Sequence, residues 1–363
     1  MYTTAPPTLH LCTSAEGEGP PPESPQPRRR LWPAVVAIVL ASASVVGGVA
    51  WVALRPRPGP KSPATAFLAR YQAPDGRVIR LDQGGDTVSE GQAYAMLLAV
   101  GGRDRARFDR AWRWSEQHLQ RSDGLLSWHW SDNRVVDPMP AADADLDAAW
   151  ALSLAADRFR STGYAAASAR IAAGILANET VSAGGRPVLV AGPWATKSPY
   201  TVDPGYLAVP AMDRLATTTH DPRWAALADS SRDIIQRLTD QDGGLPPDWA
   251  GVDPSGAVWP ASPPSSSSPP GFGLEAARLL VWQAAACPVA DHAVVAGTHP
   301  PPGHPLLVVA QAAAASAAGD PRRAGRLLDV AARLDDAEPS YYGSAWVALG
   351  RLLLTSHDLV PCP

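Results

Sequence analysis

Cysteine is scarce in this chain of 363 residues, which contains only Cys12, Cys287 and Cys362. No Cys-x-x-Cys or His-Glu-x-x-His spacing occurs. Three such cysteines cannot build a disulfide framework or a thiolate zinc site, so we expect no metal centre. The sequence does not place Cys287 and Cys362 within reach of each other, and their pairing is left open.

An excess of positive charge is also absent. The formal net charge is -4, and Lys61 and Lys197 are the only lysines. A protein that binds nucleic acid through a basic surface needs the opposite balance, so we expect no nucleic-acid partner. Charged residues make up only 18% of the chain and apolar residues 46%. This apolar content is enough for a large core, which excludes global disorder.

The N-terminal region contains a long stretch without charge. Residues 1–30 are polar and Pro-rich, and we predict that they form a disordered cytoplasmic tail. Residues 31–54 contain no charged side chain. Because a helix needs about 20 apolar residues to cross a bilayer, and the core of a signal peptide is shorter, we predict an uncleaved transmembrane signal anchor there.

The flanks of this stretch predict its orientation. Arg28 to Arg30 lie directly against its first edge, which favours an N-terminus inside the cell. We therefore expect a single-pass protein of the cell membrane with a large domain outside; secretion after cleavage is the alternative. Residues 55–63 (RPRPGPKSP) are predicted to be a Pro-rich linker, and residues 64–360 the domain.

The domain has a helical pattern. Ser62-Pro63 predicts a helix cap followed by proline in the first turn, and apolar residues recur at helical spacing, as at Phe108 and Trp112. No βαβ rhythm and no repeat of fixed period is present, which predicts a large all-α domain of about eleven helices. The expected helices after the first are 88–101, 104–119, 145–161, 164–178, 205–216, 222–239, 272–286, 305–318, 320–334 and 340–355. Strands are expected at 78–81 and 186–190, and long loops at 120–143 and 240–271.

Glu90 stands in the first candidate site, the segment TVSEGQAY at 87–94. One interpretation is structural: Thr87 caps a helix, and Glu90 completes a capping box three residues later. The other is functional: Glu90 is a general acid, kept protonated near neutral pH by apolar or anionic surroundings, and Tyr94 supplies part of that wall. The segment alone favours the capping box.

The second candidate site is acidic. The segment ADADLDAAW carries Asp143, Asp145 and Asp147 at the start of a predicted helix. Carboxylates are favoured at helix N-termini, and Asp143 is the expected cap. Asp143 and Asp147 can also share one helix face, where clustered acids facing a cleft can bind sugar hydroxyls, activate water or hold a metal.

In the third segment, GFGLEAAR, Glu275 and Arg278 stand three residues apart. On one helix this spacing predicts an exposed ion pair of about 0.2–0.5 kcal/mol. Taken alone, the segment indicates no function.

Together these segments resemble glycoside hydrolase family eight. Residues 71–130, which include PDGRV and SEGQAY, resemble the N-terminal half of its members. Further likeness lies in AADADLDAAWALSLAADRF (141–159), VDPGYLAVPAM (202–212), LPPDW (245–249) and YYGSAWVALGRLLL (341–354). At VDPGYLAVPAM the family has Asn-Pro-Ser-Tyr, and at LPPDW it has Pro-Asp-Trp. The resemblance implies an (α/α)6 barrel and inverting hydrolysis of a β-1,4-linked polysaccharide without a metal or an organic cofactor.

The resemblance also implies roles for single residues. Glu90 matches the proton donor, and Asp143 matches the aspartate that contacts the sugar at the cleavage point. The general base of the family is an aspartate in Tyr-Asp-Ala-x-Arg; here Glu275 takes its position and Leu274 replaces the aromatic residue. Asp145 and Asp248 are reserve candidates for the base. The residues expected to bind substrate are Asp145, Tyr94, Trp128, Trp130, Tyr206, Trp249 and Arg278, with Trp194 as a further flat surface for a sugar ring.

We therefore expect an endo-β-1,4-glucanase that acts on a β-1,4-glucan at the cell surface. A chitosanase or a xylan-acting enzyme of the same fold is one alternative. Another is a catalytically weakened, glycan-binding accessory protein of a polysaccharide synthesis or export system, with a synthase complex as candidate partner. An unrelated α/α barrel for lipid or peptide chemistry would need a metal or thiol site that the sequence does not offer.

Overall fold

The computed structural model describes residues 62–241 and 244–362. The predicted tail (1–30), the predicted anchor (31–54) and most of the predicted linker (55–63) lie outside the described residues. In the part of the chain that is described, no helix combines the length and the apolar character that crossing a bilayer requires.

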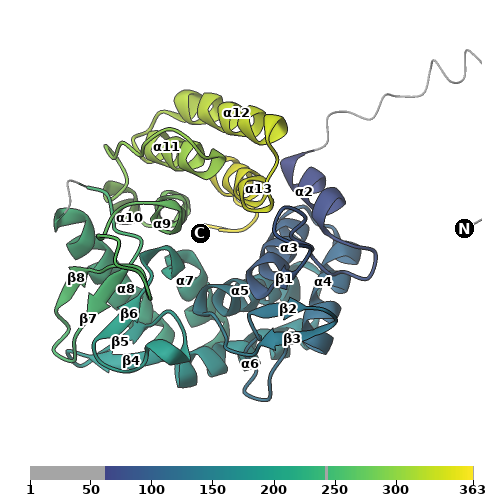
Figure 1. The fold of residues 1–363 in the computed structure, drawn as a ribbon, viewed down its shortest axis with the longest axis horizontal. Coiled ribbons are helices and arrows are strands. Elements are labelled where there is room, and N and C mark those ends of the chain that lie inside the picture. The colour runs from purple at the N-terminus through teal and green to yellow at the C-terminus, as the bar shows by residue number, and fades with distance from the viewer. Residues whose placement is uncertain (1–61, 242–243, 363) are drawn as a thin grey trace, which may run out of the picture. The chain divides into compact units, whose positions relative to one another are not determined.

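Two concentric sets of helices form a ring, which confirms the (α/α)6 barrel (Figure 1). The inner helices are α3 (Ser89–Gly101), α5 (Ala142–Arg158), α7 (Val209–Thr219), α9 (Leu274–Ala285), α11 (Pro305–Ala317) and α13 (Tyr341–Thr355). Each packs against the next, and α13 packs against α3 to close the ring. The outer helices are α2 (Pro63–Tyr71), α4 (Arg105–His118), α6 (Thr162–Asn178), α8 (Pro222–Gln241), α10 (Val289–Ala293) and α12 (Pro321–Ala337). The expected helices are all present; the sequence did not predict the short α10.

The composition of each helix follows from its layer. Inner helix α3 has neighbours on every side, and each of its residues except Glu90 is buried. Such a helix must be apolar or small all round. Outer helix α4 instead buries one stripe, with Phe108 and Trp112 among its residues, and turns its charged residues outward. Gly350 of α13 lies so close to Val309 of α11 that a larger residue would force these inner helices apart.

Helix starts match the capping signals at several positions. The Ser62 hydroxyl accepts from the Thr65 N–H at 3.2 Å, and Asp104 and Asp320 accept from N–H groups three residues later. These bonds satisfy backbone donors that the first turn leaves free.

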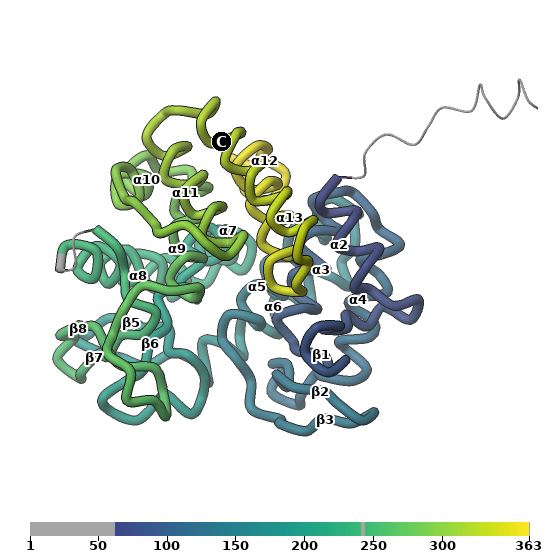
Figure 2. The backbone as a smooth tube through the Cα atoms, turned by 45° about the horizontal axis from the view of Figure 1, so that its top comes forward, coloured from purple at the N-terminus to yellow at the C-terminus, as the bar shows by residue number. Residues whose placement is uncertain are grey.

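Three small sheets occupy the connections. They are β1 (Thr87–Val88) with β2 (His129–Ser131) and β3 (Arg134–Asp137), then β4 (Thr180–Ala183) with β5 (Arg186–Leu189), and β6 (Tyr200–Val202) with β7 (Ala250–Val252) and β8 (Val258–Pro260). Figure 2 shows β1–β3 and β6–β8 along the lower edge of the ring. Strand β5 confirms the expectation at 186–190. The strand expected at 78–81 is wrong: Val78 makes a single bridge to Gln72, and a turn begins at Leu81.

A disulfide fastens the C-terminal end of the chain. Cys287, two residues after α9, is bonded to Cys362, with 5.4 Å between their Cα atoms. The Arg158 guanidinium of α5 donates to the Asp358 carbonyl at 3.0 Å. The sequence left the pairing of Cys287 and Cys362 open, and the structure joins them. Their 75-residue separation explains why spacing alone did not reveal the bridge.

Candidate active site

The first turns of the inner helices gather the candidate residues. Glu90, Asp143 and Glu275 are each the second residue of their helix, and Tyr341 is the first residue of α13. A helix N-terminus carries partial positive charge, which favours carboxylates there. The barrel therefore brings together acids that are far apart in the sequence.

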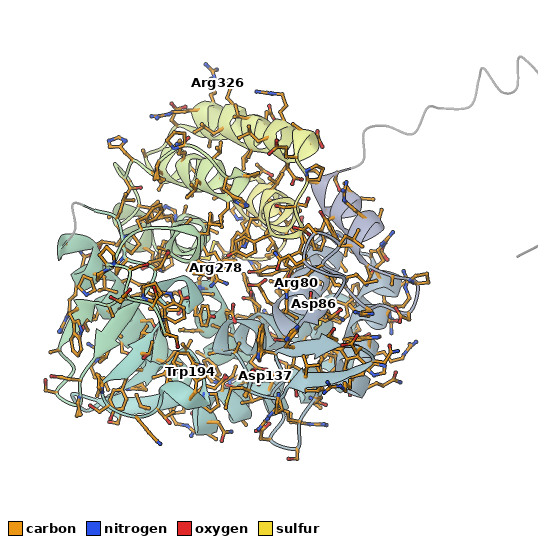
Figure 3. All side chains as sticks on the ribbon, viewed as in Figure 1. Arg80, Asp86, Asp137, Trp194, Arg278 and Arg326 are labelled. Atoms are coloured by element: carbon orange, nitrogen blue, oxygen red, sulfur yellow. A yellow bond between two sulfur atoms is a disulfide. The ribbon has the colours of Figure 1, made fainter. Side chains whose placement is uncertain are left out.

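Arg278, one turn further along α9, connects these acids. Its Nη1 donates to Asp143 Oδ2 at 2.8 Å and lies 3.5 Å from Glu90 Oε2. Its Nη2 donates to Glu275 and lies 3.7 Å from Asp203 Oδ2. In Figure 3, Arg278 lies near the middle of the ring. One guanidinium thus contacts four carboxyl groups, and its charge is compensated on both sides.

Burial divides the cluster into two kinds of group. The side chains of Arg278 and Asp203 are 2% and 0% exposed, whereas those of Glu90 and Glu275 are 22% and 37% exposed. Glu90 and Glu275 can therefore reach a bound molecule, while Arg278 and Asp203 can act only through their neighbours.

Glu90 has the properties of a proton donor near neutral pH. Burial and the nearby Asp143 raise its pKa to about 7, against the opposing effect of Arg278. The Tyr341 hydroxyl donates to Glu90 Oε1 at 3.0 Å. The capping-box interpretation is wrong, because the Thr87 hydroxyl donates to the Val78 carbonyl instead and Val88 is the N-cap residue.

Asp143 is not the cap of α5. The N-cap position belongs to Ala141, which provides no side-chain bond, and the Asp143 carboxylate instead accepts from Arg278. Asp145 was expected to bind substrate or to be a reserve base, but its side chain is fully buried and accepts from the Leu126 N–H at 2.8 Å. Asp145 therefore offers no surface to a sugar.

Glu275 and Arg278 form the expected ion pair, but only the Glu275 side of the pair is open, because Arg278 is buried. Partial burial of its carboxylate raises the pKa of Glu275, and the neighbouring Arg278 opposes this shift without reversing it. Asp248, the other reserve base, accepts from the Gly273 and Ala276 N–H groups at 2.9 and 2.8 Å. It therefore caps α9 from a neighbouring loop and fixes the turn that carries Glu275.

The aromatic candidates occupy different positions. The Tyr206 ring lies 4.9 Å from the Arg278 guanidinium carbon, and Trp249 lies beside Tyr206 with 6.4 Å between ring centroids. Tyr94, expected to bind substrate, is fully buried, and its hydroxyl lies 3.4 Å from Arg278 Nη1. Tyr94 therefore contacts the Arg278 guanidinium and offers no surface to a sugar.

The other candidate tryptophans, Trp128, Trp130 and Trp194, lie on or near the small sheets. Trp130 packs edge-on against Trp114 of α4 at 5.5 Å, so it attaches β2 to an outer helix. Trp128 is half-buried beside His129, and Trp194 has an open face with 44% exposure.

Sequence reasoning missed three residues. Asp203 and Tyr341 contact the cluster directly. The Tyr342 hydroxyl is buried with no hydrogen-bond partner among the described residues, and burial raises its pKa well above the usual value. All three stand in segments quoted for the family resemblance, which was the only signal available. Across 62–241 and 244–362, no group of three or more His, Cys, Asp or Glu is arranged to hold a metal ion.

Comparison with known proteins agrees with this geometry. A curated endoglucanase from Cellulomonas uda is 30% identical over 255 residues, which cover 69% of this chain and 68% of the relative. A probable endoglucanase from Novacetimonas hansenii is 32% identical over 60% of this chain and 64% of its own length.

Solved structures show the same architecture. An endoglucanase from Klebsiella pneumoniae, a family 8 glycosyl hydrolase, superposes with a TM-score of 0.68 at 26% identity and covers 80% of this chain and 98% of its own. The endo-β-1,4-glucanase CMCax from Acetobacter xylinum gives a TM-score of 0.66 at 28% identity, over 80% of this chain and 96% of its own. The family model for glycosyl hydrolases family 8 matches residues 25–279. The chain therefore belongs to glycosyl hydrolase family 8.

Proposed function

We propose that this chain is an inverting endo-β-1,4-glucanase. The observation that carries the proposal is the placement of Glu90 and Glu275 on different nitrogens of one guanidinium, combined with the pKa of about 7 at Glu90. Inverting enzymes use two carboxyl groups about 6.5–9.5 Å apart. Because both groups contact Arg278, their separation does not exceed the upper end of that range, and the inverting course is taken from the family resemblance. The relatives named endoglucanase supply the substrate class.

In the proposed reaction Glu90, protonated, donates its proton to the glycosidic oxygen as the bond to the anomeric carbon breaks. Glu275 accepts a proton from a water molecule, whose oxygen attacks that carbon from the opposite face. One water is consumed, and the two new ends are a reducing sugar and a free hydroxyl. Asp143, held by Arg278, contacts the sugar at the cleavage point, and Tyr206 and Trp249 offer ring faces to neighbouring sugars.

The decisive assay measures the reducing ends released from carboxymethyl cellulose, chitosan and xylan. We expect release from carboxymethyl cellulose and loss of nearly all release in Glu90→Gln, because the amide keeps the size of the side chain but cannot donate the proton. The matched control is Glu116→Gln on outer helix α4, the same substitution at an exposed glutamate outside the site. Near-wild-type turnover by Glu90→Gln would remove Glu90 from the mechanism.

Other outcomes of this assay select the alternatives. Release from chitosan or xylan alone would assign another polymer to the same site. Binding of a polymer without release by the wild-type chain would favour the glycan-binding accessory protein, which the glutamate in the position of the family's aspartate base motivates.

We further propose that the domain acts outside the cell, tethered by residues 31–54. The Cys287–Cys362 disulfide supports an oxidising compartment, and a polymeric substrate is met there. Protease added to intact cells should release a domain that lacks residues 1–54. Protection in intact but not in lysed cells would overturn this orientation. Co-purification with a polysaccharide synthase from detergent extracts tests the proposed complex.

A further inference from the structure

Asp203 is the one carboxyl group at Arg278 that no step of the proposed reaction uses. Its Oδ1 accepts from the Gly205 N–H at 2.8 Å, and its Oδ2 has no hydrogen-bond partner among the described residues. The side chain is completely buried. A buried ionised carboxylate with one free oxygen is costly, so this arrangement favours the neutral acid.

The charges around Asp203 lead to the same conclusion. Arg278 Nη2 lies 3.7 Å away but already donates to Glu275, while Nη1 serves Asp143. Burial, Glu275 and Asp143 raise the pKa of Asp203 well above its usual value, against the effects of Arg278 and the Gly205 N–H. The groups that face Asp203 are Glu275 and Arg278 on α9, Asp143 on α5, Tyr206 in its own turn and Tyr342 on α13.

Asp203 also fixes the backbone beneath Arg278. It is the N-cap residue of the short 3-10 helix η2 (Pro204–Tyr206), whose first turn it closes through Gly205. Gly205 packs directly on the Glu275 carbonyl, with no room for a side chain between them. The same turn carries Tyr206, whose ring stacks on the guanidinium at 4.9 Å. A shift of this turn would therefore move Arg278 and the start of α9.

We propose that Asp203 is a positioning residue: as a neutral acid, it holds the Tyr206 turn and leaves Arg278 Nη2 to Glu275. If Asp203 were ionised, it would compete with Glu275 for the same nitrogen. The family has asparagine at this place in the resemblance, a neutral side chain of the same shape. The inference rests on the proposed function, since it gives Glu275 the role of base.

Kinetics separate positioning from a merely structural role. At pH 6, Asp203→Asn should keep kcat within about threefold, because asparagine remains neutral and still accepts from Gly205. Asp203→Ala should lower kcat by roughly 10- to 100-fold with KM nearly unchanged, since small misplacements of reacting groups are costly. The control is Asp335→Asn on outer helix α12. Asp335 is a half-buried acid outside the cluster, and its carboxylate accepts from the Ser344 hydroxyl. Wild-type kcat in Asp203→Ala would overturn the proposal; equal losses in the two Asp203 variants would show that the charge itself is needed.

A second measurement does not depend on activity. A raised pKa in the folded state means that stability falls as pH rises from the unfolded value of about 4 toward the folded value. Asp203→Asn removes this loss of stability. The melting temperature of the variant minus that of the wild type should therefore increase from pH 5 to pH 8. A constant difference would overturn the neutral-acid assignment. If the wild type hydrolyses no glycan, the proposed function fails, while this thermal test still decides the state of Asp203.

Discussion

Tyr341→Phe tests how the barrel sets the acidity of the proton donor. The substitution removes one hydroxyl, which donates to Glu90 Oε1 at 3.0 Å. A hydrogen bond to a charged group contributes about 1.5–3 kcal/mol, and one to a neutral group about 0.5–1.5 kcal/mol. The bond therefore favours ionised Glu90 by roughly 1–1.5 kcal/mol, which corresponds to about one pKa unit. Its loss should raise the pKa of Glu90 from about 7 toward 8.

The sign of the effect on activity follows from the role of Glu90. Only the protonated acid is active, so kcat/KM falls as pH rises through this pKa. In Tyr341→Phe the falling limb should move up by about one unit, and at pH 8 about five times more of the enzyme should carry the proton. Initial rates on carboxymethyl cellulose from pH 5 to 9 measure this shift.

The control for this experiment is Tyr71→Phe. Tyr71 is a buried tyrosine whose ring lies 6.1 Å from that of Tyr341, but its hydroxyl meets Ser344 at 3.3 Å rather than Glu90. In Tyr71→Phe the falling limb of the pH profile of kcat/KM should therefore stay in place. A limb that stays or moves down in Tyr341→Phe would refute the reasoning, because the hydrogen bond would then not favour ionised Glu90.

Two further predictions concern acids at and below the site. Glu275→Ala should lose nearly all turnover on carboxymethyl cellulose, while Glu275→Asp, which restores the family's residue, should keep or improve it; high turnover in Glu275→Ala would place the base elsewhere. Glu179 is fully buried beside Asp145 with no partner for its carboxylate among the described residues, and burial followed by Asp145 raises its pKa well above the usual value. Stability is therefore lost as pH rises above about 4, and Glu179→Gln should be more stable than the wild type at pH 8 but not at pH 4, by up to about 1.4 kcal/mol for each pH unit. Urea unfolding at both pH values checks this, and a gain that is independent of pH would contradict it.

The parts of the fold that the sequence predicted are local ones. Helices begin at capping residues such as Ser62 and Asp104, and their signals lie within four residues of each other. The small sheets were largely missed because their strands are two to four residues long, too short for a clear alternation.

The site was predictable only in part, for the same physical reason. Glu90, Asp143 and Glu275 stand in distinctive segments, but their local patterns suggested a capping box, a cap and an exposed ion pair. The contacts that contradict those interpretations join residues far apart in the chain, such as Arg278 to Glu90 across 188 positions. Helix periodicity carries no information about which inner helices face each other across a barrel.

The closure of the ring by α13 has a consequence for the order in which the protein is made. Glu90 emerges early in synthesis, and its donor Tyr341 emerges 251 residues later, a delay of roughly 10–50 seconds at about 5–20 residues per second. During this interval the acid lacks the hydroxyl that favours its ionised form, and α3 lacks the neighbour that closes the ring. The tuned proton donor is therefore a property of the finished chain. A nascent chain released before α13 would carry every acidic residue of the site without Tyr341 to tune Glu90.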